Sequence, residues 1–223
     1  EQAADLQATL SRYARYFDLG PIGTQLGYPL FMKPYDGGGW VGVSKVDDEA
    51  GLRAAYEASG TKVMHLQSAV IPYEYFVRCI GLGPQTRVVN YDPDAPLHDR
   101  YRMDRGFLPP ELQGELEDIT LTINAFFGWD FNSCEALRKD GVFCPIDFDN
   151  ACPDSQVTSM HRHHPWLVAA QLKWSLFAAA TGRAMQSAMD WQPYFDVAAK
   201  AIPFEEKLRQ YAARGGNQLS GGE

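Results

Sequence analysis

A lysine followed by three glycines is the part of the sequence most suited to binding a polyphosphate. Lys33 ends a short apolar run, 28–33, and Gly37, Gly38 and Gly39 follow it closely. The lysine ammonium is a compact positive charge, and glycine backbone can approach phosphate oxygens closely because it carries no side chain. A surface lysine beside a long hairpin tip is the alternative. The segment is not a Walker A loop, in which the lysine follows the glycines.

Carboxylates gather in a second segment, where two apolar runs are separated by an Asp-Gly turn. Asp147 and Asp149 are two residues apart and share a strand face, and Glu135, across the turn, could face the same side. Burying three carboxylates without a cation is costly, whereas Mg²⁺ (or Mn²⁺) binds carboxylate and phosphate oxygens. We therefore expect a divalent metal site. A solvated acidic hairpin end is the alternative, which the flanking apolar residues disfavour.

A third segment, 64–78, lies between the first two and carries a carboxylate and an arginine. Glu74, Phe76 and Arg78 alternate along a run that predicts a strand, so we expect them to share one face. Arg78 is a candidate partner for a phosphate or for a substrate carboxylate. The alternative is a half-buried strand with a charged face.

The elements that must position these residues alternate between helices and strands, which predicts an α+β fold with mostly antiparallel pairing. The helix at 166–180 is apolar almost all round, so we expect it to be buried. In chain order the expected elements are a helix at 3–17 stopped by Gly20-Pro21, strands at 28–33 and 40–46, a helix at 48–59 capped by Asp47, strands at 62–70, 74–82 and 86–91, a helix at 111–127, strands at 131–138 and 142–148, and helices at 166–180 and within 191–213.

The composition narrows the class of protein. The chain has 223 residues, of which 45% are hydrophobic, enough for an ordinary packed core. Its net charge of −8 argues against a nucleic-acid partner, because nucleic-acid binders usually have a basic face. The most apolar stretch is too short to span a bilayer, so we expect no membrane partner. The four cysteines form no C-x-x-C pair, which disfavours a zinc or thioredoxin-type site. Four cysteines in a chain of this length do not indicate a disulfide scaffold, which favours a reducing, cytoplasmic setting.

Taken in the order in which they occur along the chain, the three segments resemble the motifs of the ATP-grasp superfamily. That family has an apolar strand, then Lys-Pro, then a glycine-rich loop and a Gly-Val strand, here Lys33-Pro34, 36–39 and Gly42-Val43. The resemblance implies that Lys33 contacts the α- and β-phosphates of ATP. It also implies that Gly37, Gly38 and Gly39 cover the phosphates as a lid loop.

The same resemblance assigns adenine and ribose contacts to the middle segment. Gln67 stands where the family often has Glu, and its amide oxygen would serve the adenine amino group. Backbone groups at Ala69 and Val70 would read the adenine edge. Glu74 would accept hydrogen bonds from the ribose hydroxyls.

For the metal, the family pattern is an acidic residue, a hairpin, and Glu-x-Asn on the returning strand. Glu135 matches the first position, and Asp147-Phe148-Asp149 lies where Glu-x-Asn is expected. Asn150 follows one residue late. Whether Asp149 or Asn150 supplies the third ligand stays open, although strand alternation favours Asp149.

The resemblance implies two α+β lobes and a helical C-terminal segment, with a small lobe at 1–72, a large lobe at 73–213 and a flexible tail at 214–223. It implies a ligase that uses ATP and Mg²⁺ to activate a carboxylate as an acylphosphate for attack by an amine. Most members carry another domain before this region, so we expect an N-terminal domain in the same protein, and residues 1–223 alone could bind nucleotide without turnover.

Two other functions stay open, a kinase that phosphorylates a small molecule and a nucleotide-binding module without chemistry. The departures from the family pattern at Gln67 and at Asp147-Phe148-Asp149 keep the nucleotide-binding module open. Two further groups have no assigned role. The histidines before Pro165 are more often exposed or structural than metal ligands, and the arginines of the Pro-rich loop either contact an anionic substrate or keep the loop soluble. They are His161, His163 and His164, and Arg100, Arg102 and Arg105.

Overall fold

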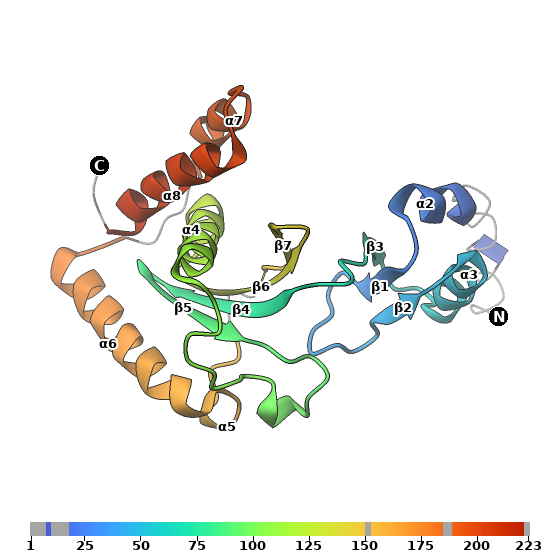
Figure 1. Cartoon of the computed structure of the whole chain (residues 1–223), viewed down its shortest axis with the longest axis horizontal. Helices are drawn as coiled ribbons and strands as arrows, with labels where there is room; N and C mark the ends of the chain where they lie inside the picture. Colours follow the sequence, from blue (N-terminus) through green and yellow to red (C-terminus); the bar gives the residue numbers. More distant parts are fainter. Residues whose placement is uncertain (1–7, 10–17, 150–152, 185–188, 221–223) are drawn as a thin grey trace. The chain divides into compact units, whose positions relative to one another are not determined.

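A computed structural model of the chain describes residues 8–9, 18–149, 153–184 and 189–220 (Figure 1). The chain forms two compact units, residues 1–71 and 72–223. Each unit has its own sheet and its own hydrophobic core. Strand pairing is antiparallel in both sheets, so the expected α+β class is confirmed.

The smaller unit is a three-stranded sheet with helices on one face. The strand order is β2-β1-β3. Leu30 and Met32 of the central strand are buried in a core with Leu52 of the second helix. The elements are α2 (Leu19–Leu26), β1 (Leu30–Pro34), β2 (Ser44–Val46), α3 (Glu49–Ala58) and β3 (Met64–Ser68).

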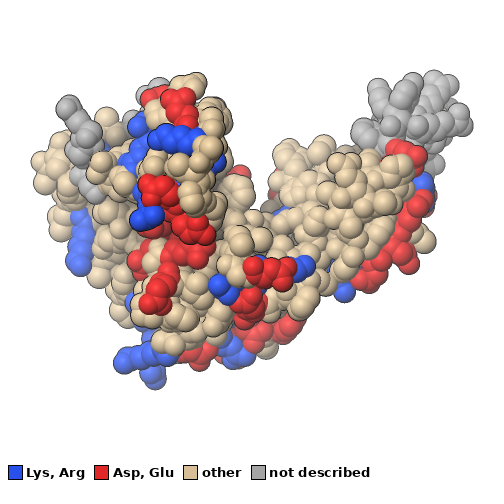
Figure 2. Space-filling model, turned by 45° about the horizontal axis from the view of Figure 1, so that its top comes forward, with Lys and Arg blue, Asp and Glu red and all other residues tan. Residues whose placement is uncertain are grey.

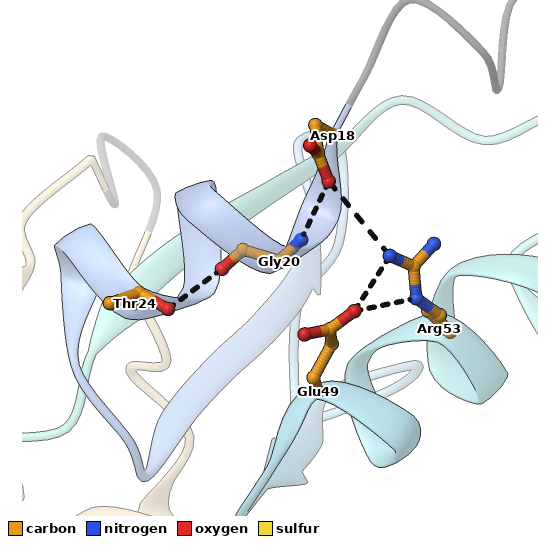
Figure 3. Close-up of polar contacts among 5 residues, drawn as sticks. All are labelled: Asp18, Gly20, Thr24, Glu49 and Arg53. Atoms are coloured by element: carbon orange, nitrogen blue, oxygen red, sulfur yellow. Dashed lines mark hydrogen bonds and ion pairs between the residues drawn. The ribbon is translucent and has the colours of Figure 1, made fainter.

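Helix α2 corrects one expectation, because Gly20 and Pro21 open this helix and do not stop the preceding one. Asp18 is its N-cap and accepts a hydrogen bond from the Gly20 N–H at 3.3 Å (Figure 3). Proline is tolerated in a first helical turn, where its missing N–H has no partner to lose. The expected helix at 3–17 falls almost entirely outside the described residues, and only Ala8 and Thr9 are assigned as helical.

The start of α3 is held by side chains that reach back toward α2. Its N-cap is Asp48, one residue after the expected Asp47, and the Asp48 Oδ1 accepts from the Gly51 N–H at 2.7 Å. Arg53 bonds to Glu49 at 2.7 Å and lies 3.9 Å from Asp18 (Figure 3). These exposed ion pairs contribute little to stability on their own, but they tie the beginnings of the two helices together.

Strand β2 is shorter than the sequence indicates. Residues 40–42 form turns and residue 43 is irregular, instead of the expected strand. Trp40 has a φ of 69° and Gly42 a φ of 77°, and this left-handed backbone cannot continue a strand.

The larger unit contains a four-stranded sheet in the order β5-β4-β6-β7, with its main core between the sheet and helix α4. Val77, Cys79, Cys134 and Ala136 face this core, and Leu116 of α4 is fully buried in it. The elements are β4 (Tyr75–Leu82), β5 (Gln85–Asn90), a 3₁₀ turn (Leu97–Asp99), α4 (Pro110–Phe127), β6 (Phe131–Lys139), β7 (Val142–Asp147), α5 (Val157–Met160), a 3₁₀ turn (His161–His163), α6 (His164–Thr181), α7 (Gln192–Ala198) and α8 (Phe204–Ser220).

Helix α6 is not buried as expected. Leu167 and Trp174 are buried, but Val168, Leu172 and Leu176 are 44%, 59% and 68% exposed. An apolar helix is covered all round only if other elements pack on every side of it. Within the described residues, α6 packs along one side only, so its other face stays open to solvent.

The expected flexible tail is also corrected, since residues 214–220 continue α8. This helix packs along α4. A Cβ added at Gly215 would lie 3.0 Å from the Leu121 carbonyl oxygen, so glycine there allows close contact between the helices. The glycine therefore serves packing and not chain flexibility.

The distribution of surface charge and the apolar character of the helices bear on possible partners. On the face shown in Figure 2, acidic and basic side chains are interspersed over the larger unit, at the left of the view. None of the described helices combines the length and the apolar character that crossing a membrane requires.

Candidate functional site

One face of the small sheet carries polar residues. Met32 points into the core, whereas Phe31 and Lys33, its neighbours on β1, point to the opposite face. Lys33 lies directly across from His65 on β3, and Phe31 lies across from Gln67. Directly opposed residues in an antiparallel pair project to the same side, so Lys33, His65 and Gln67 share this face. The sequence analysis missed His65, which alternation from Gln67 along β3 would have found.

The glycine loop beside this face is open to solvent. A Cβ added at Gly38 or Gly39 would meet nothing within 4 Å, and Gly39 has a φ of 60°. A Cβ at Gly37 would lie 3.3 Å from Pro34. Packing within the smaller unit therefore does not require glycine at position 38. The ring of Trp40, at the end of the loop, meets Phe31 edge-on with centroids 6.4 Å apart.

The segment expected to read adenine already uses one of its backbone donors. The Ala69 N–H donates to the Pro29 carbonyl at 3.1 Å, just beyond the end of β3. While this bond is intact, a nucleotide base in this segment would have to use other backbone groups, such as those of Val70.

Glu74 lies before the first residue of β4 and does not share a face with Arg78, contrary to expectation. Its carboxylate pairs with Arg138 and accepts from the Gly141 N–H at 3.3 Å. Arg138 is on the same face of β6 as the core residue Ala136. The alternation of a strand does not extend to Glu74, and the cation of Arg138 draws its side chain to the other side.

A cavity of about 390 Å³ lies at the start of β4. Its walls include Tyr73, Glu74, Asn90, Tyr91 and Arg102, all from the larger unit. Glu74 is thus accessible to a small polar ligand although it is paired with Arg138.

Three charged residues form a row across three adjacent strands. Arg78 on β4 lies directly opposite Glu135 on β6, and Glu135 lies directly opposite Asp147 on β7. The Arg78 Nη1 donates to the Glu135 Oε1 at 2.8 Å. The side chains of Arg78 and Glu135 are only 11% and 8% exposed. The strand register thus sets the two expected metal ligands, Glu135 and Asp147, opposite each other.

The third expected carboxylate, Asp149, lies beyond the end of β7. Strand β7 ends at Asp147, and the pairing with β6 is irregular between Glu135 and Ala136, so period-two alternation does not carry over to Asp149. No cluster of three or more His, Cys, Asp or Glu side chains suited to a metal occurs among the described residues. Asn150 lies outside the described residues. Arg78 offsets the buried charge of Glu135.

Comparisons with known proteins point to one superfamily. D-alanine–D-alanine ligase A of Chromobacterium violaceum is 48% identical over 69 residues, 30% of this chain and 18% of the relative. D-alanine–D-alanine ligase of Shouchella clausii is 28% identical over 150 residues, 60% of this chain and 39% of the relative. No family model matches the chain.

Solved structures agree with these relatives in fold. D-alanine–D-alanine ligase from Bacillus anthracis superposes with a TM-score of 0.56 and 18% identity, covering 75% of this chain and 60% of that one. The complex of that ligase with ATP gives a TM-score of 0.51 and 17% identity, over 66% and 49% of the two chains. The chain therefore has the ATP-grasp fold. The ATP-grasp relatives are ligases, and the matched segments span 18% and 39% of the length of the two curated relatives above.

Two of the histidines before Pro165, His161 and His163, contact backbone carbonyls of the larger unit. His163 is buried, its Nε2 lies 3.0 Å from the Arg102 carbonyl, and its Nδ1 lies 3.4 Å from the Arg87 Nε. Because Arg87 can only donate, Nδ1 accepts and Nε2–H donates to the carbonyl. Burial lowers the pKa of His163, and the nearby Arg87 acts in the same direction. The Nε2 of His161 contacts the His98 carbonyl.

Two arginines of the Pro-rich loop also have structural partners. Arg102 pairs with Asp92, and the Arg100 Nε donates to the Ala95 carbonyl at 3.0 Å. Both bonds join residues of the same loop, so they stabilise its conformation.

Proposed function

We propose that this chain is the nucleotide-binding part of a ligase that uses ATP and Mg²⁺ to activate a carboxylate as an acylphosphate for attack by an amine. The register of β6 with β7, which sets Glu135 opposite Asp147, carries this proposal. The polar face of the small sheet, with Lys33 and Gln67, supports it. We further propose that 1–72 is the lid lobe and 73–213 the large lobe of the enzyme.

Lys33 is proposed to bind the phosphates of ATP. Its ammonium would attract phosphate oxygens, and Gly37, Gly38 and Gly39 would let the backbone N–H groups approach them. Holding the phosphate next to the substrate carboxylate makes attack effectively intramolecular, and the fixed positive charge stabilises the transferring group.

Glu135 and Asp147 fit a magnesium ion that also binds a triphosphate. Mg²⁺ in nucleotide sites is held by one or two carboxylates together with phosphate oxygens and water, so two carboxylates are a sufficient donor set. Bound Mg²⁺ would neutralise charge on the phosphates during transfer. We propose Asp149 or Asn150 as a third oxygen ligand.

For the nucleoside, we propose that Gln67 and the backbone at Ala69 and Val70 bind adenine, and that Glu74 binds the ribose. Ala69 can take part through its carbonyl while its N–H stays bonded to Pro29. Glu74 can accept a ribose hydroxyl while paired with Arg138, because an ionised carboxylate has about four lone-pair sites.

The substrates are proposed to be a small carboxylate and a small amine. Two of the matched relatives are named D-alanine–D-alanine ligases, so D-alanine is the first substrate to test. We also propose that a preceding domain of the same protein helps to bind the acceptor, because the matched segments span well under half of those relatives.

Calorimetric titration of ATP with and without Mg²⁺ tests the nucleotide site. Lys33→Ala should weaken Mg·ATP binding by about tenfold or more, since hydrogen bonds to charged groups contribute about 1.5–3 kcal/mol. Lys62→Ala removes an exposed lysine just before β3 and is the matched control. Equal affinity in wild type and Lys33→Ala would contradict the assignment of the phosphates.

The reaction is tested separately, by ADP release from the protein with its preceding domain. A ligase should release ADP only with a carboxylate and an amine together, whereas a kinase should need only an alcohol. Saturable Mg·ATP binding without ADP release across such substrates would point to a nucleotide-binding module without chemistry.

A further inference from the structure

The charged row on the large sheet contains its own cation. We propose that Arg78 is an internal counter-cation that occupies the Glu135–Asp147 pair when no nucleotide is bound, so that a divalent metal binds these carboxylates only together with a nucleotide. This inference rests on the proposed function, because it deepens the role of the same two carboxylates.

The position of Arg78 is set by strand register and not by a mobile loop. Arg78 and Glu135 are directly opposed on neighbouring strands, and their side chains meet at 2.8 Å with little exposure to water. Asp147 is the next residue in the same row and adds to the negative potential at Arg78. A buried pair of this kind holds because each charge would be costly without the other.

Neighbouring side chains fix the plane of the guanidinium. The Arg78 Nη2 donates to the Ser133 Oγ at 2.9 Å. The Arg78 Cζ lies 5.9 Å from the ring centroid of Tyr91 and 5.6 Å from that of Tyr101, within the range of cation–π attraction. The guanidinium is therefore pre-organised over Glu135 before any ligand arrives.

One donor of Arg78 remains unused in this arrangement. Its buried Nε has no hydrogen-bond partner among the described residues, and neither does the buried hydroxyl of Tyr101. Unsatisfied buried donors are costly, which favours a second arrangement in which an anionic ligand takes hydrogen bonds from Arg78. The phosphates of a nucleotide are ligands of that kind.

The balance of charge explains why a metal alone should bind weakly. Two carboxylates and one guanidinium sum to a single negative charge, and a divalent cation would also be repelled by Arg78. A nucleotide triphosphate brings several negative charges, so it can attract Arg78 and add oxygen ligands to the metal. Binding of metal and of nucleotide is thus expected to be cooperative.

Binding of Mn²⁺ alone, measured by the loss of the free-ion electron paramagnetic resonance signal, tests the inference. Arg78→Gln removes the charge, and it should tighten Mn²⁺ binding in the absence of nucleotide by at least about tenfold, or about 1.4 kcal/mol. Arg78→Lys keeps the charge and should bind Mn²⁺ as weakly as wild type. The double variant Arg78→Gln/Glu135→Gln should lose the gain, because it removes a ligand as well as the cation.

The result that would overturn the inference is an Arg78→Gln affinity for Mn²⁺ no higher than that of wild type. Removing Arg78 takes away the guanidinium that pairs with the buried Glu135 and lowers stability, so thermal melts are recorded with and without Mn²⁺. Stabilisation of Arg78→Gln by Mn²⁺ alone, absent in wild type, also supports the inference. If Arg78→Gln does not fold under either condition, Ser133→Ala, which loosens the guanidinium, should still tighten Mn²⁺ binding measurably, and unchanged binding overturns the inference.

A wild-type titration with Mg·ATP separates the two proposals. If wild type binds Mg·ATP and Arg78→Gln binds Mn²⁺ no better than wild type does, the proposed role of Arg78 is wrong and the proposed nucleotide site still stands. Wild type that fails to bind Mg·ATP sinks the proposed function, and the Mn²⁺ titrations then still decide whether Arg78 holds the metal away.

Discussion

At the scale of single residues, the partner of a charged side chain decides what that side chain can do. Glu74 and Glu135 are both carboxylates at the larger sheet, yet each pairs with a different arginine on a different face. Glu74 is half-exposed beside Arg138 and lines a cavity, whereas Glu135 is buried against Arg78. Under the proposed function, Glu74 would bind a neutral ribose hydroxyl without losing its partner, whereas Glu135 would exchange the Arg78 cation for a metal ion.

His163 makes stability depend on pH. Burial and Arg87 lower its pKa below the usual 6.5, so the unfolded state binds a proton more readily than the folded state. The contribution of His163 to the free energy of unfolding should be fully present above about pH 6.5. It should be lost as the pH drops from there toward the pKa of the folded state, and the free energy of unfolding should fall by at most about 1.4 kcal/mol per pH unit. Urea unfolding at pH 7.5 and 5.5 measures this loss.

The matched variant for this prediction is His163→Gln, which cannot take up the proton. It should be less stable than wild type at pH 7.5 but should lose less stability between pH 7.5 and 5.5. An equal loss in both proteins would mean that His163 does not cause the pH dependence.

At the scale of elements, close packing of α6 on the sheet depends on a glycine in the β4–β5 turn. Gly83 has a φ of 55°, and a Cβ added there would lie 2.3 Å from the ring of Trp174 on α6. Trp174 is buried, so its ring has little space to move. The turn and the helix therefore cannot keep their positions if the glycine gains a side chain.

Gly83→Ala should lower the free energy of unfolding by about 2 kcal/mol or more, from overpacking and left-handed strain together. Gly114→Ala is the matched control, because a Cβ at Gly114 in α4 would meet nothing within 4 Å. It should stabilise the protein by about 0.5–1 kcal/mol, the helix preference for alanine. Chemical denaturation of both variants checks this, and a neutral Gly83→Ala would contradict the packing argument.

At the scale of the whole molecule, the described residues of each unit have a hydrophobic core of their own, and each core stabilises its own unit. Leu52 is fully buried in the core of residues 1–71, and Leu116 is fully buried in that of residues 72–223. The two cores share no residues. Each unit is therefore expected to open by its own cooperative transition.

Leu52→Ala should destabilise the smaller unit by about 2–5 kcal/mol and leave the larger unit nearly unchanged, and Leu116→Ala should do the reverse. Hydrogen exchange measured by mass spectrometry on peptides from each unit reports the two free energies separately. An equal increase of exchange in both units for either variant would show that they unfold together.

Much of the fold was predictable because its signals are local. The residues of β1, β3, β4 and α4 follow period-two or helical patterns, and Asp140-Gly141 turns the last hairpin, with φ values of 51° and 80°. A short hairpin sets the register next to its turn, here from Lys139 opposite Val142 to Ala136 opposite Pro145. These features need only residues close together in the chain. The turn alone does not set Glu135 opposite Asp147, because that pairing depends on the irregularity between Glu135 and Ala136.

The sequence by itself determined the α+β class, the opposite faces of Met32 and Lys33 on β1 and the glycine loop beside Lys33. Only the tertiary structure decided that Arg78 pairs with Glu135, that Glu74 turns to Arg138, that one face of α6 stays exposed and that Gly215 serves helix packing. Arg78 and Glu135 lie 57 positions apart. Such contacts depend on which strands and helices become neighbours, and no pattern within a single element specifies that.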